Sequence, residues 1–465
     1  MITLEERNRS KPLYFQIYLH IKREIHEGRL KAGERLYSKR KLAESLGVSV
    51  NTVETAYSQL LSEGFIEARP KSGYYVCQID ELNFVRNAGK RGLAKGGEDK
   101  TETDIIDFST DGVDWERFPY NTWIKLIKGC FNEYNPGILK SPPPEGDYEL
   151  RKAVAGHIYR YRGVSCSAGQ IIIGAGMDNL LNIICGLLGR EYSVIMEEPV
   201  YRESYSVFKY NGHRVGLIPV DGEGLMTGRL PSVGKAAVYI TPSHQFPLGM
   251  TMSAARRVKL LNWASAAEGR YIIEDDYDSE FRYNSKPIPA VQSIDGNGRV
   301  IYLGTFSKTI APSVRISYMA LPPGLMDEYN RRFTKFSTSV SALEQEVIAA
   351  FINGGHYERH LNRMRKLYGE KRAVLLEELG KLGDAISING ENAGHHLALR
   401  LKNGPGEEKM TELAAENGVR VYPISPYFIN GTPENYENTV LIGYASLPKE
   451  RITEGVERLR SAWGI

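Results

Sequence analysis

The sequence has few cysteines, no long apolar run and almost no net charge. Only 4 of 465 residues are cysteine, none of them in a C-x-x-C pair, so we expect reduced thiols and neither a zinc site nor a disulfide framework. No apolar run reaches the ~18 residues of a transmembrane helix. Residues 1–11 are too polar for a secretory signal. These absences predict a cytoplasmic protein without a metal or a membrane partner.

Charge is unevenly distributed along a chain of ordinary globular composition, which is long enough for two or three domains. The whole chain has a net charge of +3, yet residues 1–78 hold 13 basic and 9 acidic residues, a net charge of +4. Residues 79–103 are neutral, and residues 104–465 have a net charge of −1. A polyanionic partner is therefore expected to bind the N-terminal segment.

The first 78 residues show the element order of a winged helix-turn-helix. Helices are predicted over 12–27, 39–46 and 50–63, and strands over 65–69 and 74–76. The third helix, capped by Ser49, would lie in a major groove of DNA. The residues expected to contact DNA are small or basic: Lys39, Arg40, Ser49, Asn51, Thr52, Arg69 and Lys71. The alternative is a solvated basic surface on a protein-interaction domain, which the basic residues beside the wing disfavour.

Two stretches of this segment, 33–43 and 48–66, resemble the signature of the GntR family of bacterial regulators. The first reads GERLYSKRKLA, and the second begins VSVNTV and ends LLSEGFI. In that family the arginine at position 40, the start of the recognition helix and the wing contact DNA. The resemblance implies double-stranded promoter DNA as a partner of residues 1–78. The glycine-rich, charged residues 79–103 are predicted to be a linker rather than an ordered loop.

From residue 104 to 465, short apolar strands alternate with helical stretches, which predicts an α/β domain around a mostly parallel sheet. Strands are expected at 171–173, 193–196, 237–240, 271–273 and 300–303. Ligands bind such sheets at the carboxyl ends of the strands, so the residues that follow each strand are the candidates for function.

Three of these strand ends carry polar or glycine-rich sequences. A glycine-rich turn over 174–179 precedes a helix and is able to hold a phosphate. The run 274–278 contains four acidic residues and a tyrosine, which is consistent with a metal site, a partner for a protonated heterocyclic nitrogen, or a solvated loop. Lys308 lies between hydroxyl residues and seven positions before Arg315, so it is either a surface charge or the Schiff-base lysine of a phosphorylated carbonyl cofactor.

Taken together and in this order, the three strand ends resemble fold-type I pyridoxal 5′-phosphate aminotransferases. The resemblance implies that Lys308 forms the Schiff base, Asp275 pairs with the pyridine nitrogen and Tyr277 donates to the ring phenolate oxygen. It further implies that Tyr201 borders the ring. Phe246, before Pro247, occupies the position of an asparagine that contacts the ring oxygen, and His244 or Gln245 would make this contact instead. The predicted phosphate ligands are Thr305, Ser307, Arg315 and the backbone of Ala175, Gly176 and Met177.

A GntR-type head (1–78) joined by a linker (79–103) to an aminotransferase-like body (104–465) is the layout of the MocR/GabR subfamily of GntR regulators. The segments 244–247, 274–283 and 304–308 also resemble that subfamily. The implied fold is multidomain, an α+β winged helix-turn-helix followed by an α/β fold-type I domain. The implied function is that of a transcriptional regulator, a head-to-tail homodimer that binds pyridoxal phosphate. Its effector would be pyridoxal phosphate itself, an amine, an amino acid or a D-alanyl dipeptide.

Efficient catalysis is not expected, because the strand predicted at 439–445 has no arginine to hold a substrate carboxylate. Arg202, Arg400 and Arg420 are candidates to take its place. We expect at most a half-transamination. The alternatives are an active aminotransferase with an attached DNA-binding domain, and a body kept only for dimerisation. The second alternative is disfavoured because the expected cofactor residues are all present.

Overall fold

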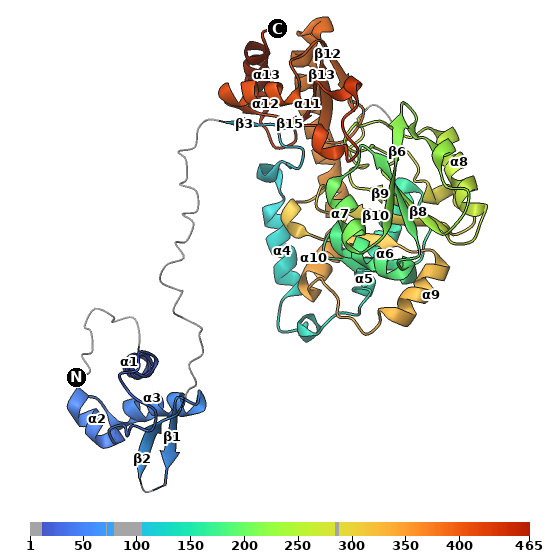
Figure 1. Ribbon diagram of the computed structural model, residues 1–465. Helices are drawn as coiled ribbons and strands as arrows, with labels where there is room; N and C mark the ends of the chain where they lie inside the picture. The colour runs from blue at the N-terminus through green and yellow to red at the C-terminus, as the bar shows by residue number, and fades with distance from the viewer. Residues whose placement is uncertain (1–11, 71, 79–104, 284–287) are drawn as a thin grey trace. The chain divides into compact units, whose positions relative to one another are not determined.

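A computed structural model describes residues 12–70, 72–78, 105–283 and 288–465. The chain divides into two compact units, Met1–Lys100 and Thr101–Ile465, which are described separately (Figure 1). Lys71 and the predicted linker over 79–103 lie outside the described residues. None of the helices within the described ranges is long and apolar enough to cross a membrane.

The smaller unit has the predicted order of elements, a winged helix-turn-helix. It contains α1 (Leu13–His26), α2 (Lys39–Leu46), α3 (Val50–Ser62), β1 (Ile66–Arg69) and β2 (Gly73–Val76). The hydroxyls of Ser38 and Ser49 accept hydrogen bonds from the backbone of the first turns of α2 and α3. Gly47 ends α2 at a φ of +63°, a conformation that favours glycine. Local capping signals thus place the turn between the two helices.

The smaller unit has its own hydrophobic core, separate from those of the larger unit. The fully buried residues come from all three helices and both strands: Ile17, Ile21, Leu42, Val53, Tyr57, Leu60, Ile66 and Val76. Strands β1 and β2 pair antiparallel, with Ile66 opposite Val76. The buried side chains hold the helices together, and the basic side chains remain at the surface.

The larger unit is built on an eight-stranded sheet with the order β4-β11-β10-β9-β8-β5-β6-β7. Its strands are β4 (Ile171–Gly174), β5 (Ser193–Glu198), β6 (Arg214–Asp221), β7 (Gly224–Leu225), β8 (Ala236–Ile240), β9 (Arg270–Asp276), β10 (Val300–Thr305) and β11 (Ser317–Ala320). The five strands from β10 to β6 are parallel, and the outer pairings are antiparallel. The prediction of a mostly parallel α/β sheet is confirmed.

Helices cover both faces of the large sheet, as Figure 1 shows. One face packs against α6 (Met177–Leu188), α7 (Arg202–Tyr210) and α9 (Pro323–Arg332). The other packs against α5 (Tyr148–Arg162), α8 (Ala254–Ser265), α10 (Ala342–Asn353) and α11 (His356–Gly380). The helix α4 (Tyr120–Cys130) precedes these and has no fully buried residue. Loops at one edge of the sheet therefore remain free to form a ligand site.

A smaller sheet follows α11 and has the order β12-β13-β16-β15. It comprises β12 (Ile386–Asn389), β13 (His396–Leu401), β15 (Tyr422–Pro423) and β16 (Thr439–Gly443), with α12 (Glu407–Glu416) and α13 (Lys449–Trp463) beside it. A separate parallel pair joins β3 (Ile106–Asp107) to β14 (Val419–Arg420).

The segment after β3 contacts β16 closely at Gly443. The Gly443 amide donates to the Phe108 carbonyl at 2.9 Å. A Cβ atom at Gly443 would lie only 2.0 Å from the Ser109 carbonyl oxygen. The residues that follow, Thr110 and Asp111, are thereby held in place beside the large sheet.

The acidic residues after the expected strand 271–273 do not form a solvated loop, which was one interpretation of the sequence. Strand β9 continues to Asp276, and Glu274, Asp275, Asp276 and Asp278 are all buried, so a solvated acidic loop is wrong. Two of these carboxylates, Glu274 and Asp276, have partners in the interior. Glu274 accepts backbone hydrogen bonds at 2.8 and 2.9 Å, and Asp276 forms a 2.6 Å ion pair with Arg162 of α5.

Candidate functional site

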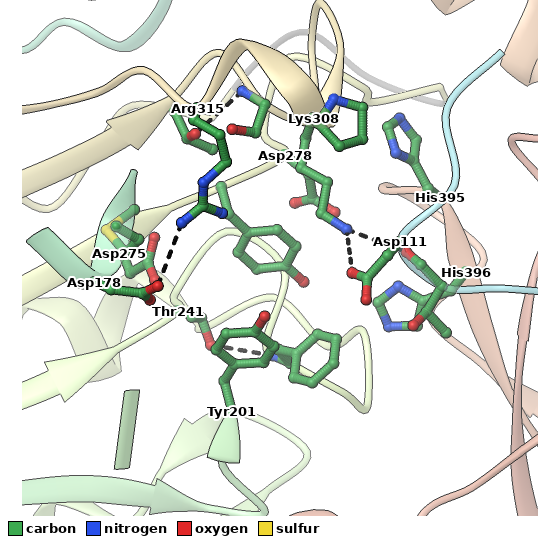
Figure 2. A pocket seen from close by; sticks show the side chains of 17 residues that line it. Asp111, Asp178, Tyr201, Thr241, Asp275, Asp278, Lys308, Arg315, His395 and His396 are labelled. Atoms are coloured by element: carbon green, nitrogen blue, oxygen red, sulfur yellow. Dashed lines mark hydrogen bonds and ion pairs between the residues drawn. The ribbon is translucent and has the colours of Figure 1, made fainter. Parts of the chain in front are cut away.

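A cavity of about 260 Å³ opens where β5, β8, β9 and β10 end (Figure 2). Its lining brings together residues from all three strand ends singled out in the sequence. The lining residues are Thr110, Asp111, Met177, Asp178, Tyr201, Thr241, Phe246, Asp275, Tyr277, Asp278, Thr305, Ser307, Lys308, Pro312, Arg315, His395 and His396. This position at the carboxyl edge of the sheet is where α/β folds bind ligands.

Lys308 presents its amine to the cavity from the loop after β10. Its Nζ lies 2.7 Å from Asp111 Oδ1 and donates to the Thr110 carbonyl at 3.2 Å. The Lys308 side chain is 21% exposed, whereas that of Asp111 is 73% exposed. The amine is thus accessible from the cavity and paired with the segment that follows β3. Sequence reasoning missed Thr110 and Asp111, which belong to no recognisable motif.

Asp275 lies on the opposite side of the cavity from Lys308 in Figure 2. Its Oδ2 accepts a hydrogen bond from the Tyr239 hydroxyl, but its Oδ1 has no hydrogen-bond partner in the described part of the chain. Burial raises the pKa of Asp275 to about 7, although the Tyr239 hydrogen bond acts in the other direction. A buried carboxylate with an unpartnered oxygen fits a protonated ring nitrogen, which would stabilise its charged form.

Arg315 lies beside the start of α6, in a left-handed backbone conformation with a φ of +49°. Its Nη2 is 3.3 Å from Asp178 Oδ2. A Cβ atom at Gly176, whose φ is +88°, would approach that Nη2 to 2.7 Å, so the glycine makes room for the guanidinium. A guanidinium at a helix N-terminus, at a cavity that Thr305 and Ser307 also line, is suited to a phosphate.

The predicted backbone ligands of this phosphate are only partly at the cavity. Met177 lines it, but Ala175 and Gly176 do not. The Ala175 amide donates to the Ser339 hydroxyl at 3.1 Å, so it already has a partner. The role of these three residues as phosphate ligands stays a prediction.

Two predicted tyrosines line the cavity, and the predicted histidine lies behind it. The Tyr277 hydroxyl donates to the His244 carbonyl at 3.0 Å, and burial raises the pKa of this phenol well above its usual value. Tyr201 meets Phe246 edge to face, with ring centroids 5.1 Å apart. His244 is buried outside the lining, with Nδ1 2.8 Å from Asp278 Oδ2. Its contact to a ring oxygen therefore stays a prediction.

Two adjacent histidines at the start of β13 also line the cavity. His396 Nε2 lies 3.1 Å from the Pro247 carbonyl oxygen. His395 is 2% exposed, and neither of its ring nitrogens has a hydrogen-bond partner among the described residues. Burial lowers the pKa of both imidazoles well below the usual value, so both are neutral. The sequence offered no signal for them beyond the His-His pair itself.

None of the three arginines considered as carboxylate ligands lines the cavity. Arg202 is exposed at the start of α7, Arg420 lies 3.3 Å from Asp107, and Arg400 lies on β13 opposite Ser387. Strand β16 is wholly buried and contributes no arginine. Within the described ranges, no group of three or more side chains is arranged to hold a metal ion.

The predicted DNA-contacting residues of the smaller unit lie on α2, at the start of α3 and on β1. Arg40 and Asn51 are exposed. Lys39 forms an ion pair with Glu54. Arg69 lies over the Tyr75 ring, 4.3 Å from its centroid. The Ser49 hydroxyl lies 2.8 Å from the Thr52 hydroxyl, so both are at the N-terminus of the recognition helix. Their contacts with DNA stay predictions.

Comparisons with known proteins match each unit to a separate family. Residues 13–76 match "Bacterial regulatory proteins, gntR family", and residues 104–459 match "Aminotransferase class I and II". The chain is 41% identical to the uncharacterized HTH-type transcriptional regulator YhdI of Bacillus subtilis, over 98% of this chain and 97% of that protein. It is 34% identical to the probable rhizopine catabolism regulatory protein MocR of Rhizobium meliloti, over 98% and 95% of the two chains.

The fold of the larger unit is that of solved aminotransferases. One is the kynurenine aminotransferase of Pyrococcus horikoshii in complex with PMP, with a TM-score of 0.69 and 27% identity. The match covers 78% of this chain and 91% of that enzyme. Aminotransferases of this class imply a pyridoxal phosphate site, and the donors around the cavity fit one.

Proposed function

The chain belongs to the MocR-type transcriptional regulators, in which a GntR-family DNA-binding unit precedes an aminotransferase class I and II unit, and we propose that it regulates transcription in response to an amine bound at a pyridoxal-phosphate site. It is a DNA-binding regulator. As a bacterial-type regulator of promoter DNA, it would act in the cytoplasm. Sensing of the effector is the part that this proposal adds.

The observation that carries the cofactor proposal is the buried, unpartnered Oδ1 of Asp275 in a cavity that also holds Lys308 and Arg315. When bound, pyridoxal phosphate supplies an aldehyde carbon that joins reversibly to primary amines. Asp275 would hold a proton on the ring nitrogen. The carboxyl would ionise more easily beside that cation, which would offset the burial that raises its pKa.

The remaining residues would orient the cofactor. Lys308 would supply the primary amine, and Tyr277, which keeps its proton, would turn its hydroxyl from the His244 carbonyl to donate a hydrogen bond to the ring oxygen. Tyr201, on the loop after β5, would border the ring. Arg315 would neutralise the phosphate, to which Thr305 and Ser307 would also donate hydrogen bonds.

The contact between Lys308 and Asp111 suggests how the effector signal would leave the cavity. Asp111 and Thr110 lie on the segment that follows β3, which is the first described strand after the DNA-binding unit. An amine that competes with the lysine would change the partners of Lys308 and therefore the contacts of this segment. Such a difference in contacts between two states is what coupling between two sites requires.

Apolar side chains at the surface of the larger unit support a homodimer. Helix α4 has no fully buried residue, and several large apolar residues on and around it are exposed: Trp115, Tyr120, Ile124, Phe131 and Leu139. Exposed apolar patches of this kind usually mark interaction surfaces. We propose that a second copy of the chain covers this one.

The test of the cofactor site is the absorbance spectrum of the purified full-length protein with pyridoxal phosphate. Wild type should show the visible band of a cofactor bound through lysine, and Lys308→Ala should lack it. Lys335→Ala is the matched control, because Lys335 is exposed and does not line the cavity. A band of equal strength in Lys308→Ala would reject the assignment of the lysine.

The test of regulation uses a DNA sequence that the purified protein selects from a random library. Its affinity for wild type should change when an amine that alters the absorbance band is added. The same amine should leave the DNA affinity of Lys308→Ala unchanged. Equal responses of the two proteins would show that the signal does not pass through this lysine.

A further inference from the structure

His395 is a buried imidazole at the cavity that no described residue hydrogen-bonds. Its ring is packed between Phe281 and Tyr368, with ring centroids 4.4 and 4.6 Å away. Neither ring nitrogen has a hydrogen-bond partner within the described ranges, and the residue is 2% exposed. Burying an unpaired polar group costs free energy, so a buried one that lines a cavity indicates that a ligand pairs with it.

The backbone around His395 is held by hydrogen bonds and by close packing. The Gly394 carbonyl accepts hydrogen bonds from the Tyr444 hydroxyl at 2.6 Å and the Tyr283 hydroxyl at 2.8 Å. The His395 carbonyl accepts from the Tyr444 amide at 3.0 Å. The site is also crowded, since a Cβ atom at Gly394 would lie 2.2 Å from the His244 ring. The backbone that carries the imidazole is therefore held at the cavity lining.

The charges around the cavity favour a ligand without a carboxylate. Only two cationic side chains line it among the described residues, Lys308 and Arg315, and the proposed function gives both to the cofactor. Three further carboxylates line it besides Asp275: Asp111, Asp178 and Asp278. A carboxylate on the effector would meet acidic groups and neutral imidazoles without a cation of its own, which is electrostatically unfavourable.

We propose that the effector is a hydroxylated amine without a carboxylate, and that His395 determines this specificity by hydrogen-bonding the hydroxyl group. The inference rests on the proposed function, because the amine is detected through the bound cofactor. A neutral imidazole has one donor and one acceptor nitrogen, so it pairs with a hydroxyl in either direction. Asp111, which is exposed at the cavity, favours a ligand that carries positive charge.

The first experiment titrates the cofactor-loaded full-length protein with three amines of similar size: 3-amino-1-propanol, n-butylamine and β-alanine. The readout is the concentration at which each amine half-shifts the cofactor absorbance band. We expect aminopropanol to act at a concentration about fivefold below that of butylamine, the value of roughly one hydrogen bond. We expect β-alanine to need at least about tenfold more than aminopropanol, because its carboxylate finds no cation.

The second experiment repeats the titrations with His395→Phe, which replaces the imidazole by an apolar ring. The half-shift concentration of aminopropanol should rise to that of butylamine, while butylamine keeps its wild-type half-shift concentration. A merely structural role of His395 would not produce this change in selectivity. His395→Gln retains hydrogen-bonding capacity and should restore part of the advantage, and it serves as the second variant if His395→Phe does not fold. His213→Phe is the control, because His213 is also buried but lies outside the cavity.

The outcomes separate this inference from the function on which it rests. If wild type shows no cofactor band at all, the proposed function fails. If the band is present but β-alanine acts as well as aminopropanol, or none of the amines shifts it, the inference about the effector is overturned. If His395→Phe raises the half-shift concentrations of aminopropanol and butylamine equally, His395 does not hydrogen-bond the hydroxyl group.

Discussion

The two units place their functional side chains in opposite environments. In the DNA-binding unit, Arg40 and Asn51 are exposed, and the ion pair of Arg69 with Glu67 lies at the surface. In the aminotransferase-like unit, Asp275 and His395 are almost fully buried. Water screens the charges of the first group, whereas the second group depends on partners supplied by the fold or by a ligand.

This difference in burial determines how much a single residue contributes to binding. Phosphate contacts at an exposed surface add in small, similar steps, so no one basic residue decides binding. A buried carboxyl or imidazole interacts with one partner in a medium of low dielectric constant, so its loss has a large and local effect. Four experiments test whether the units differ in this way, from the largest expected effect to the smallest.

Asp275→Ala should raise the dissociation constant of pyridoxal phosphate on the order of 10²- to 10³-fold, because removing one partner of a buried charge pair costs roughly 3–5 kcal/mol. The measurement is an absorbance titration of the full-length protein with the cofactor. Asp327→Ala, at an exposed position of α9, is the control and should bind normally. A small effect of Asp275→Ala would mean that the buried unit is as tolerant as the exposed one.

Asp275→Asn should alter how the stability of the cofactor-free protein depends on pH. The folded-state pKa of Asp275 is about 7, above the ordinary value of 3.8, so folding takes up a proton between these two pH values. Wild type therefore loses stability as pH rises from about 4 to 7, and the asparagine variant should lose less, by on the order of 2 kcal/mol. Denaturant unfolding of the larger unit at pH 5 and pH 8 measures this, and identical losses would contradict it.

Arg40→Ala should lower the affinity for selected DNA about tenfold and reduce the slope of log affinity against log salt concentration by about one. Arg29→Ala is the matched control in the same unit, since the Arg29 guanidinium is exposed and paired with Glu24 at 2.7 Å. Fluorescence anisotropy over a range of salt concentrations gives both numbers. An effect of Arg40→Ala as large as that of Asp275→Ala on its own ligand would remove the contrast between the units.

Ser49→Ala should destabilise the DNA-binding unit by about 1 kcal/mol, because the Ser49 hydroxyl caps α3 by accepting from the Thr52 amide at 3.2 Å. Ser49→Asp keeps a capping oxygen but adds negative charge beside the expected phosphate contacts. It should therefore preserve stability and weaken DNA binding, as thermal unfolding and anisotropy would show. Equal DNA affinities of wild type and Ser49→Asp would place the start of α3 away from the phosphates.

The fold of the smaller unit could be predicted well because its signals are local. Ser38, Ser49 and Gly47 mark the helix ends through contacts with their immediate neighbours in the chain. The end of β9 was placed too early, because Glu274 and Asp276 look like loop residues in isolation. Their partners are distant in sequence: Arg162 pairs with Asp276, and the backbone at Val291 binds Glu274.

In the candidate site, too, residues in local motifs could be predicted and residues from distant segments could not. The motifs identified Lys308, Asp275, Tyr277 and Arg315, and the structure places all four at one cavity. The motifs did not identify Asp111 or His395, which reach the cavity from segments far from it in the sequence. Such residues have no characteristic spacing, because their position follows from the packing of the small sheet against the large one.

The close contact at Gly443 has a consequence for how this protein can evolve. A side chain at that position would collide with the Ser109 carbonyl, and Ser109 directly precedes the two residues that hold Lys308. Substitutions in the cavity wall can change the effector preference, but the contact between β16 and the segment after β3 leaves no room for a side chain at position 443. We therefore expect glycine to be retained at this position when the cavity wall changes, and with it the placement of the two residues that contact Lys308.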